Sequence, residues 1–429
     1  MPFPDGPGEP KLIQTVRWLA RPIALLESCR RRYGDVFSLN FLGFKTPMVI
    51  VSDPEHVRGL YAESTNALPP GRSAALLPLL GARSVLLTEG AEHLSRRKLM
   101  LPPFHGERMR RYEELVREIA ERAIAGWRPG RTFALHPHMQ AITLDVILRA
   151  VFGIADGARA DALRRELPLL LDGTSSAALQ FRVLASRQTG RGDPMAALRA
   201  ASESIDDVLL AEIADRREAP PGDDILSGLI AARFEDGEAM NDRELRDQLM
   251  TLLLAGHETT ATGLAWTFDL LLRHPETLAR LRDEVARGED SYLRAVVQEG
   301  LRLRPVVPIA GRRLTRELRA GDHLLAPGTD VTPAIWLTHT RPDLYPEPYA
   351  FRPERFLDQP PTTYGWIPFG GGVRRCLGAA FAEMEMRVVL AEIVRSVRLE
   401  AAAPRAERVT RRNITFSPRH GTRVRIASV

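Results

Sequence analysis

The strongest constraint on the fold is a helical pattern that continues without interruption through residues 241–273. Apolar residues recur at three- and four-residue spacing, which indicates one long helix. Asn241 is a suitable N-cap with Glu244 as its capping-box partner, and His274-Pro275 ends the pattern because proline disfavours a helical residue before it. At 1.5 Å per residue the helix is roughly 45–50 Å long. That length is enough to cross the molecule.

The rest of the chain is also mainly helical. Further helical patterns cover residues 11–32, 105–127, 143–152, 194–217 and 379–397. Short β-rich runs predict a hairpin at residues 36–51, and β-like segments return at residues 306–333 and 413–426. Because these β pieces are distant in sequence and no repeat or linker separates them, the sequence predicts a mainly α fold with a minor β portion. We expect a single domain over residues 1–429, with residues 1–10 as an extended lead-in.

Composition excludes several classes of protein. The 429 residues are 44% hydrophobic and 26% charged, a globular balance. Only 6% are aromatic and no block of like charges occurs, so the net charge of +5 does not indicate nucleic-acid binding. No apolar run approaches about 18 residues, and a signal-peptide pattern is absent. Together with only two cysteines, Cys29 and Cys376, this predicts a cytoplasmic protein without a membrane span.

A polar hexad interrupts the long helix near its middle. It reads Ala255-Gly256-His257-Glu258-Thr259-Thr260, between apolar runs on both sides. A glycine inside a helix costs about 1 kcal/mol relative to alanine, and an acid beside two threonines breaks the apolar pattern. The hexad is either a polar stripe that faces solvent or a locally opened helix with a groove and a proton path. The residues alone leave both interpretations open.

Cys376 lies in a loop that suits a reactive thiolate. Three glycines, Gly370 to Gly372, precede it and allow close backbone approach, and the helical pattern that begins at residue 379 follows it. The start of a helix and the neighbouring Arg374 and Arg375 both favour the thiolate. No second cysteine or histidine stands at zinc-binding spacing. A single thiolate of this kind suits one axial bond to a metal, and the iron of a haem is the natural candidate.

This segment resembles the haem-binding loop of the cytochrome P450 family of haem-thiolate monooxygenases. The family pattern is Phe-x-x-Gly-x-Arg-x-Cys-x-Gly, and its five fixed positions are matched by Phe369, Gly372, Arg374, Cys376 and Gly378. Three more signatures of the family follow in the expected order, so the resemblance covers essentially the whole chain. It implies the cytochrome P450 fold around a buried haem b, with Cys376 as the ligand of the iron.

The resemblance gives the hexad a role over the distal face of the haem. It implies that Gly256 makes room for dioxygen, that Thr259 donates a hydrogen bond to the dioxygen, and that Glu258 gates protons. His257 occupies the variable position of the motif and receives no role.

The resemblance also assigns a structural ion-pair set. Glu299 and Arg302 share a helix face at i, i+3 spacing and would by themselves be an ordinary surface pair. In the family, such a pair joins a later arginine, here Arg355, in a buried triad behind the haem loop. The triad would serve folding and haem retention.

The propionates of a haem require cations. His93 and Arg97 stand at i, i+4 spacing and resemble the propionate-binding pair of the family, in which many members have tryptophan at the position of His93. Arg312 matches a further propionate ligand, and the adjacent Arg313 leaves that choice open by one residue. In this arginine-rich chain, the order of the motifs is what singles these side chains out.

The family layout suggests a cavity lined by aliphatic residues. Its members in this chain are Leu79, Leu86, Phe181, Ala255, Val307, Ile309, Ile414 and Thr415. An apolar cavity suits a mostly hydrocarbon substrate, so we expect a fatty acid, a terpenoid or a polyketide-like macrocycle. Arg182 or Arg412 is a candidate anchor for a carboxylate.

The expected activity is insertion of one oxygen atom of O2 into such a substrate, by hydroxylation or epoxidation. The chain has no room for a fused reductase, so electrons from NAD(P)H would arrive through a ferredoxin or flavodoxin and its reductase, and we expect a monomer. A basic patch should attract that partner; its candidate members are Arg96, Lys98, Arg108, Arg110, Arg111 and Arg375. The alternatives are a peroxide-driven peroxygenase, which would not need Glu258 and Thr259, and a non-catalytic haem sensor or carrier.

Overall fold

The computed structural model describes residues 3–62, 72–154, 156–175, 196–412 and 414–428. Helices account for most of these residues. Their bounds are α1 Lys11–Ala20, α2 Pro22–Tyr33, α3 Pro54–Ala62, α4 Arg72–Leu80, α5 Gly90–Met100, α6 Arg108–Ala125, α7 Leu135–Phe152, α8 Ala158–Ser175, α10 Ala196–Glu218, α11 Ile225–Ala231, α12 Asp242–Leu271, α13 Pro275–Ala286, α14 Ser291–Leu303, α15 Ile335–His339, α16 Arg355–Asp358 and α17 Ala379–Ser396, with single 3-10 turns at Pro102–Phe104 and Gly372–Arg374. Within these described ranges, no helix is both long and apolar enough to cross a membrane.

The strands are short and form four small sheets. Their bounds are β1 Val36–Leu39, β2 Met48–Val51, β3 Thr132–Ala134, β4 Arg312–Arg313, β5 Leu318–Ala320, β6 His323–Leu325, β7 Asp330–Pro333, β8 Arg398–Ala401, β9 Val409–Arg412, β10 Thr415–Pro418 and β11 Arg423–Ser428. The largest sheet has the order β1-β2-β7-β4, in which only β2 and β7 are parallel. The order β3-β11-β8 makes a second sheet, and β9-β10 and β5-β6 are antiparallel hairpins.

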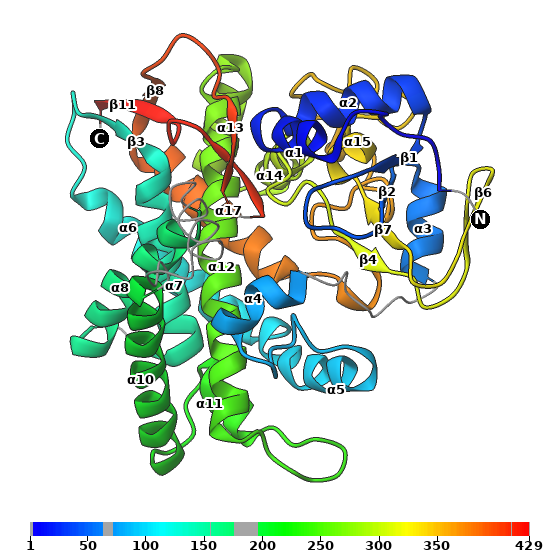
Figure 1. The fold of residues 1–429 in the computed structure, drawn as a ribbon. Helices are drawn as coiled ribbons and strands as arrows, with labels where there is room; N and C mark the ends of the chain where they lie inside the picture. The colour runs from blue at the N-terminus through cyan, green and yellow to red at the C-terminus, as the bar shows by residue number, and fades with distance from the viewer. Residues whose placement is uncertain (1–2, 63–71, 155, 176–195, 413, 429) are drawn as a thin grey trace.

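The long helix α12 runs through the helical part of the molecule, beside α7 and α10 (Figure 1). Its N-terminus has the predicted capping box: Asn241 Oδ1 accepts from the N–H of Glu244 at 3.0 Å, and Glu244 Oε2 accepts from the N–H of Asn241 at 3.1 Å. These two bonds satisfy N–H groups that have no partner inside the helix. Most of the apolar core surrounds this helix.

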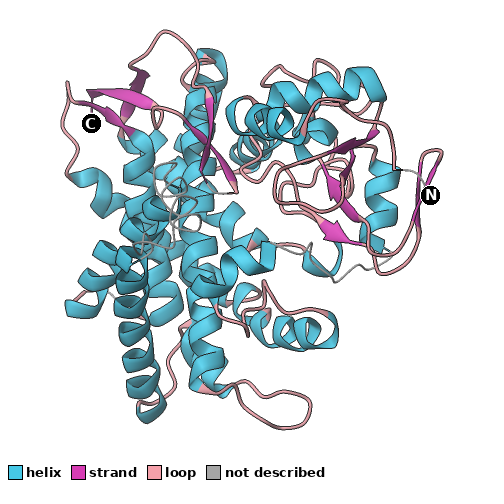
Figure 2. Ribbon diagram, viewed as in Figure 1, coloured by secondary structure: helices cyan, strands magenta, loops and turns pink. Residues whose placement is uncertain are grey.

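The two larger sheets lie in different parts of the molecule. Figure 2 shows the largest sheet on the side of the molecule that carries the N-terminus, and the β3-β11-β8 sheet near the C-terminus. One apolar cluster packs the sheet against α3, and another packs it against α2 and α15. The arrangement is mainly α with a minor β portion, as the sequence predicted.

Candidate functional site

The polar hexad lies in the middle of α12. Thr259 Oγ1 donates to the main-chain carbonyl of Ala255 at 2.6 Å, which turns this hydroxyl back along the helix. Ala255 is exposed and Thr259 half-buried, whereas Glu258 and Thr260 are buried. One face of the hexad therefore borders accessible space and the other lies in the protein interior.

Gly256 allows α12 to pack closely against α7. A Cβ atom at this position would lie 2.6 Å from Cδ1 of Ile147, closer than side-chain carbons approach one another. A larger residue at this position would require the Ile147 side chain to move. The role of Gly256 in making room for dioxygen stays a prediction.

Glu258 is buried between α7 and β9. Gln140 Nε2 donates to its Oε2 at 2.6 Å, while Arg412 Nη1 lies 3.6 Å from its Oε1. The ring nitrogen Nε2 of His136 lies 3.8 Å from the same oxygen. The sequence suggested Arg412 as an anchor for a substrate carboxylate, but the structure pairs it with Glu258. Arg182, the other candidate anchor, lies outside the described residues.

The histidines near Glu258 do not supply its counter-charge. Burial, with the charge of Arg412 as a second cause, lowers the pKa of His136 to about 3 and that of His257 to about 4. Both rings are therefore neutral near pH 7. His257 Nδ1 lies 3.2 Å from Thr143 Oγ1, so this residue, which received no role from the sequence, belongs to the contact between α7 and α12.

The cysteine loop has a shape that requires glycine. Gly370 and Gly372 have φ angles of 66° and 64°, in the left-handed region that glycine adopts most easily. A Cβ atom on Gly371 would overlap the ring of Tyr61, and one on Gly372 would lie 2.7 Å from the carbonyl oxygen of Tyr61. The loop thus lies directly against the end of α3.

Cys376 stands just before α17. Its N–H donates to the carbonyl of Phe369 at 2.9 Å, which closes the loop, and Gly378 is the N-cap of α17. The side chain is accessible, yet protein surrounds it closely enough that lost hydration raises the pKa of the thiol. A hydrogen bond from the N–H of Gly378 and the charges of Arg375 and Arg97 lower the pKa and partly offset this effect. These three groups would stabilise a thiolate.

Basic side chains gather between α5 and the cysteine loop. His93 is buried, and its Nε2 lies 3.3 Å from the carbonyl oxygen of Val373 in the loop. Burial and then Arg312 lower the pKa of Arg374 to about 10, with a smaller contribution from Arg97. Burial likewise lowers the pKa of Arg97. The positive charges of Arg374, Arg312 and Arg97 lie close enough to lower the pKa of Arg374. A cluster of cations favours the binding of an anion.

The structure distinguishes Arg312 from Arg313. Arg313 Nε donates to Asp330 at 2.8 Å, so its charge is already paired. Arg312 is only 6% exposed, donates to the carbonyl of Gly311 at 2.9 Å and faces the ring of Tyr61. Among the residues that the structure describes, no carboxylate pairs with it. Of the two arginines, Arg312 is the one suited to bind an external anion.

Glu299, Arg302 and Arg355 come together behind the cysteine loop. Nε and Nη2 of Arg302 donate to the two oxygens of Glu299 at 2.7 and 2.8 Å, and Arg355 Nε donates to Glu299 at 3.2 Å. The side chains of Glu299 and Arg302 are 0% exposed. Arg302 also donates to the carbonyls of His339, Pro348 and Ala350. Every donor of this buried cation therefore has an acceptor, while its role in cofactor retention stays a prediction.

His339 joins this network to the cysteine loop, and the sequence analysis did not find it. Its Nε2 accepts from the N–H of Ile367 at 2.8 Å, and its Nδ1 lies 3.1 Å from the carbonyl oxygen of Arg302. Burial, with Arg302 adding to it, lowers the pKa of His339 to about 3. The neutral ring can then donate through Nδ1 and accept through Nε2. A lone histidine carries no sequence signal for such a link.

Sequence similarity to known proteins extends over almost the whole chain. Residues 4–419 match the family described as Cytochrome P450. The chain is 43% identical over 436 residues to cytochrome P450 135B1 of Mycobacterium bovis. This alignment covers 99% of this chain and 92% of that protein. It is 40% identical to cytochrome P450 137 of Mycobacterium tuberculosis, over 92% of this chain and 83% of that protein. The chain belongs to the cytochrome P450 family.

The fold of this cytochrome P450 is also shared with a solved structure. The structure described as retinoic acid bound cyanobacterial CYP120A1 superposes with a TM-score of 0.86 at 25% identity, over 100% of both chains. Cytochromes P450 are haem-thiolate monooxygenases, so the chain is an enzyme of that class with the cytochrome P450 fold, and haem is its cofactor.

The residues of this cytochrome P450 fit a haem. Cys376 offers an accessible thiol with backbone and arginine groups that favour its ionised form, which suits an axial bond to iron. Arg312 is a buried cation without a carboxylate among the described residues, which suits a propionate. Cys376 thus suits the iron of that cofactor, and Arg312 suits its propionate groups.

The predicted lining of the substrate cavity is only partly accessible. The members with exposed or half-buried side chains are Leu79, Leu86, Ala255, Val307, Ile309 and Ile414. Thr415 is buried, with its hydroxyl donating to the carbonyl of Arg412, and presents little surface to a ligand. Phe181 lies outside the described residues.

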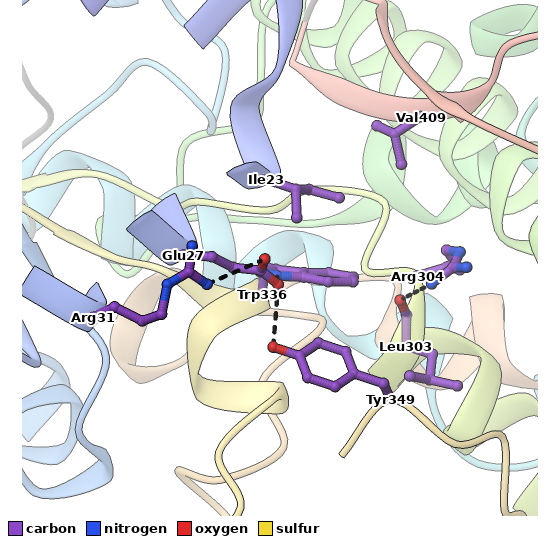
Figure 3. Close-up of a pocket in the computed structure, with 8 residues that line it drawn as sticks. All are labelled: Ile23, Glu27, Arg31, Leu303, Arg304, Trp336, Tyr349 and Val409. Atoms are coloured by element: carbon purple, nitrogen blue, oxygen red, sulfur yellow. Dashed lines mark hydrogen bonds and ion pairs between the residues drawn. The ribbon is translucent and has the colours of Figure 1, made fainter. Parts of the chain in front are cut away.

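A separate hollow of about 570 Å³ opens beside α2 and the end of α14 (Figure 3). Within it, Glu27 accepts hydrogen bonds from Trp336 Nε1 at 3.3 Å and from the hydroxyl of Tyr349 at 3.2 Å. Its lining is Ile23, Glu27, Arg31, Leu303, Arg304, Trp336, Tyr349 and Val409. None of the site residues predicted from the sequence belongs to it.

The basic patch expected for a redox partner is smaller than the sequence suggested. The prediction is wrong for Arg96, which is buried and pairs with Glu244 at 2.7 Å and Glu92 at 2.9 Å. Carboxylates also neutralise two exposed members: Lys98 pairs with Glu235, and Arg111 with Asp223. The remaining members are Arg108, Arg110 and Arg375.

Proposed function

We propose that this enzyme inserts one oxygen atom of O2 into a hydrophobic substrate, by hydroxylation or epoxidation. The observation that supports the proposal is the contact between α17, which begins just after Cys376, and α12, which contains the polar hexad. A Cβ atom on Gly263 of α12 would lie 3.1 Å from Cε of Met386 on α17, so the two helices are in direct contact. Thr260 of the hexad interacts with Glu385 of α17. These contacts between α12 and α17 support a single site that includes the thiol before α17 and the polar break in α12.

In the proposed mechanism, a bound haem would supply the oxygen chemistry, and the protein would control its surroundings. Cys376 would bind the iron, and the N–H of Gly378 and Arg375 would help to stabilise its thiolate. Arg312 and Arg97 would bind the propionates, and Arg374 and His93 would hold the cysteine loop against the segment that precedes α5. The contacts of Arg374 and His93 with the carbonyls of Leu86 and Val85 support that assignment.

Glu258 and Thr259 would supply protons to the reaction. Gln140 fixes one oxygen of Glu258, and the charge of Arg412 lies 3.6 Å from the other oxygen. Arg412 is partly exposed, so this ion pair connects Glu258 to the protein surface. The hydroxyl of Thr259 donates to the carbonyl of Ala255 and would be able to rotate toward the reaction site.

Electrons come from NAD(P)H through an external ferredoxin or flavodoxin and its reductase. A peroxygenase takes both protons and electrons from peroxide, so the buried pairing of Glu258 favours the monooxygenase. The test is product formation by the holoenzyme with a reductase, a ferredoxin and NAD(P)H, compared with hydrogen peroxide alone. Product with NAD(P)H and little with peroxide is expected. The reverse pattern identifies a peroxygenase. A sensor is identified if ligands shift the haem spectrum but none of them yields product in either assay.

We propose fatty acids and terpenoids as substrates, with polyketide-like macrocycles as a further class. The accessible predicted lining residues are aliphatic, and the structurally similar CYP120A1 is described as bound to retinoic acid, a largely hydrocarbon carboxylic acid. Because Arg412 is paired with Glu258, it does not provide the carboxylate anchor that favoured fatty acids.

A titration panel tests this substrate class. Lauric acid, a monoterpene, retinoic acid and a macrolide are added to the oxidised holoenzyme, and the spin-state change of the haem absorption is followed. At least one of these apolar compounds should bind at micromolar concentration, whereas glucose and a small hydrophilic amine should not. Tight binding of the amine with no response to the apolar compounds would contradict the proposal.

A further inference from the structure

Helix α1 turns two polar residues, Gln14 and Thr15, and the ring of Trp18 toward the protein. Gln14 is 1% exposed; its Nε2 donates to the carbonyls of Pro7 and Glu9 at 3.0 and 2.8 Å, and its Oε1 accepts from the N–H of Asn40 at 2.8 Å. Thr15 Oγ1 accepts from the N–H of Leu42 at 2.9 Å. These bonds fix the rotation of the helix about its own axis, because turning it outward would leave buried polar groups without partners.

The outer side of α1 is apolar. Its exposed residues are Leu12, Ile13, Val16 and Leu19, which are 58%, 47%, 53% and 49% exposed. They follow the i, i+1, i+4, i+7 spacing of one helix face. Leu42, 51% exposed, extends this surface because its N–H is bonded to Thr15. An ordinary surface helix turns most of its apolar residues inward, whereas α1 partly buries only Trp18 in this way. Figure 1 shows α1 beside α2.

Cations border this apolar face. Lys11 and Lys45 are exposed, and two of the three lysines of the chain are therefore found here. The ammonium of Lys11 donates to the carbonyl of Phe44 at 2.9 Å, which holds it at the edge of the face. Arg21, at the end of the helix, is exposed as well, whereas Arg17 is paired with Glu9.

From the fixed orientation, the apolar face and its positive border, we propose that α1 docks on a membrane surface that contains anionic phospholipids. Leu12, Ile13, Val16, Leu19 and Leu42 enter the boundary between headgroups and acyl chains, and Lys11, Arg21 and Lys45 contact lipid phosphates. Apolar burial and attraction to anionic headgroups act together in helices that lie in the plane of a membrane. A second copy of this chain would bring cations against cations at the same border, so the charges favour lipid.

Flotation of the holoenzyme with vesicles of phosphatidylcholine and phosphatidylglycerol tests the proposal. The double variant Leu12→Gln, Val16→Gln should lower the vesicle partition coefficient by about tenfold or more, because each lost apolar contact weakens lipid binding. The matched control is Leu169→Gln on α8, since Leu169 is also 58% exposed. The control should bind like the parent enzyme. Equal binding by parent and double variant, or equal loss in the control, overturns the proposal.

The positive border is tested separately. Lys11→Gln combined with Lys45→Gln should weaken binding to these vesicles by up to about thirtyfold, because each basic residue adds attraction to the anionic surface, and should have little effect on vesicles of phosphatidylcholine alone. Sedimentation of the parent enzyme at rising concentration provides the remaining outcome. The lipid assignment is overturned if the parent enzyme does not bind vesicles but forms a dimer that the Leu12→Gln, Val16→Gln variant abolishes. The partner of α1 would then be a second copy of this chain.

Discussion

The two cysteines show how environment decides the chemistry of one residue type. Cys29 is 2% exposed and packs with Leu25, Leu26 and Trp336, and burial raises the pKa of its thiol. Lost hydration also raises the pKa of the Cys376 thiol, but this side chain is accessible, and a backbone N–H and two arginines partly offset the effect. Only the second thiol has the surroundings of a metal ligand.

The prediction at this scale is the loss of the haem-thiolate spectrum in Cys376→Ala. The red-shifted absorption band of the reduced enzyme with carbon monoxide should disappear, because that band depends on thiolate donation to iron. Cys29→Ala is the control and should keep the band, with some loss of stability from the cavity it creates. Retention of the band in Cys376→Ala would refute the assignment.

At the scale of elements, the contact of α14 with the segment before α16 depends on a buried charge. Glu299 accepts from Arg302 on its own helix, from Arg355 and from the N–H of Arg352, so its two oxygens join α14 to residues 352–355. Removing one partner of such a network leaves an uncompensated charge inside the protein.

Glu299→Gln should therefore lower the free energy of unfolding by about 3–5 kcal/mol. The matched control is Glu55→Gln, because Glu55 and Arg58 form an exposed pair at the same i, i+3 spacing. That change should cost no more than about 1 kcal/mol. Urea denaturation followed by circular dichroism measures both. If Glu299→Gln does not fold, Arg355→Met, which removes the more accessible partner, should still be destabilised more than the control. Equal stability of control and buried variants would contradict the prediction.

Local patterns predicted the elements well. The capping box of α12, the β1–β2 hairpin and the helix that follows Cys376 all have the expected positions, because each depends on residues close in sequence. The helical pattern of residues 11–32 is in fact two helices, since Pro22 begins α2. Proline is favoured at the first position of a helix.

The neighbours of the site residues were beyond sequence reasoning. Gln140, His339 and Arg412 each act on a residue far away in the chain, and a lone glutamine, histidine or arginine has no local pattern that marks it. The prediction that Arg96 lies in a surface patch was wrong for the same reason. Its burial depends on Glu244, which the fold brings to it from the start of α12.

Three buried histidines influence the stability of the whole molecule. Burial, the first cause in each case, lowers the pKa of His136 and His339 to about 3 and that of His257 to about 4. The folded protein keeps them neutral at pH values where the unfolded chain, with a pKa near 6.5, binds protons. Stability is therefore lost as the pH falls below about 6.5. Burial raises the pKa of Glu385, which gives the opposite slope above about pH 4.5.

The prediction is that His257→Leu reduces the acid sensitivity. Each buried histidine contributes up to about 1.4 kcal/mol per pH unit between roughly pH 4 and pH 6.5, so removing one should flatten the slope by about that amount. His105, which is exposed, provides the control His105→Asn, with an unchanged slope. Urea denaturation at several pH values measures the slopes. Identical slopes for parent and His257→Leu would show that this ring is protonated in the folded state.

The order of strands in the largest sheet also has a consequence for synthesis on the ribosome. Strand β2, at residues 48–51, pairs in parallel with β7, at residues 330–333. At about 5–20 residues per second, the partner strand is made on the order of 15–55 seconds after the hairpin. During that interval the emerging β1–β2 hairpin has an unpaired edge and an uncovered apolar face. The hairpin therefore remains exposed to aggregation until residues 330–333 have been translated.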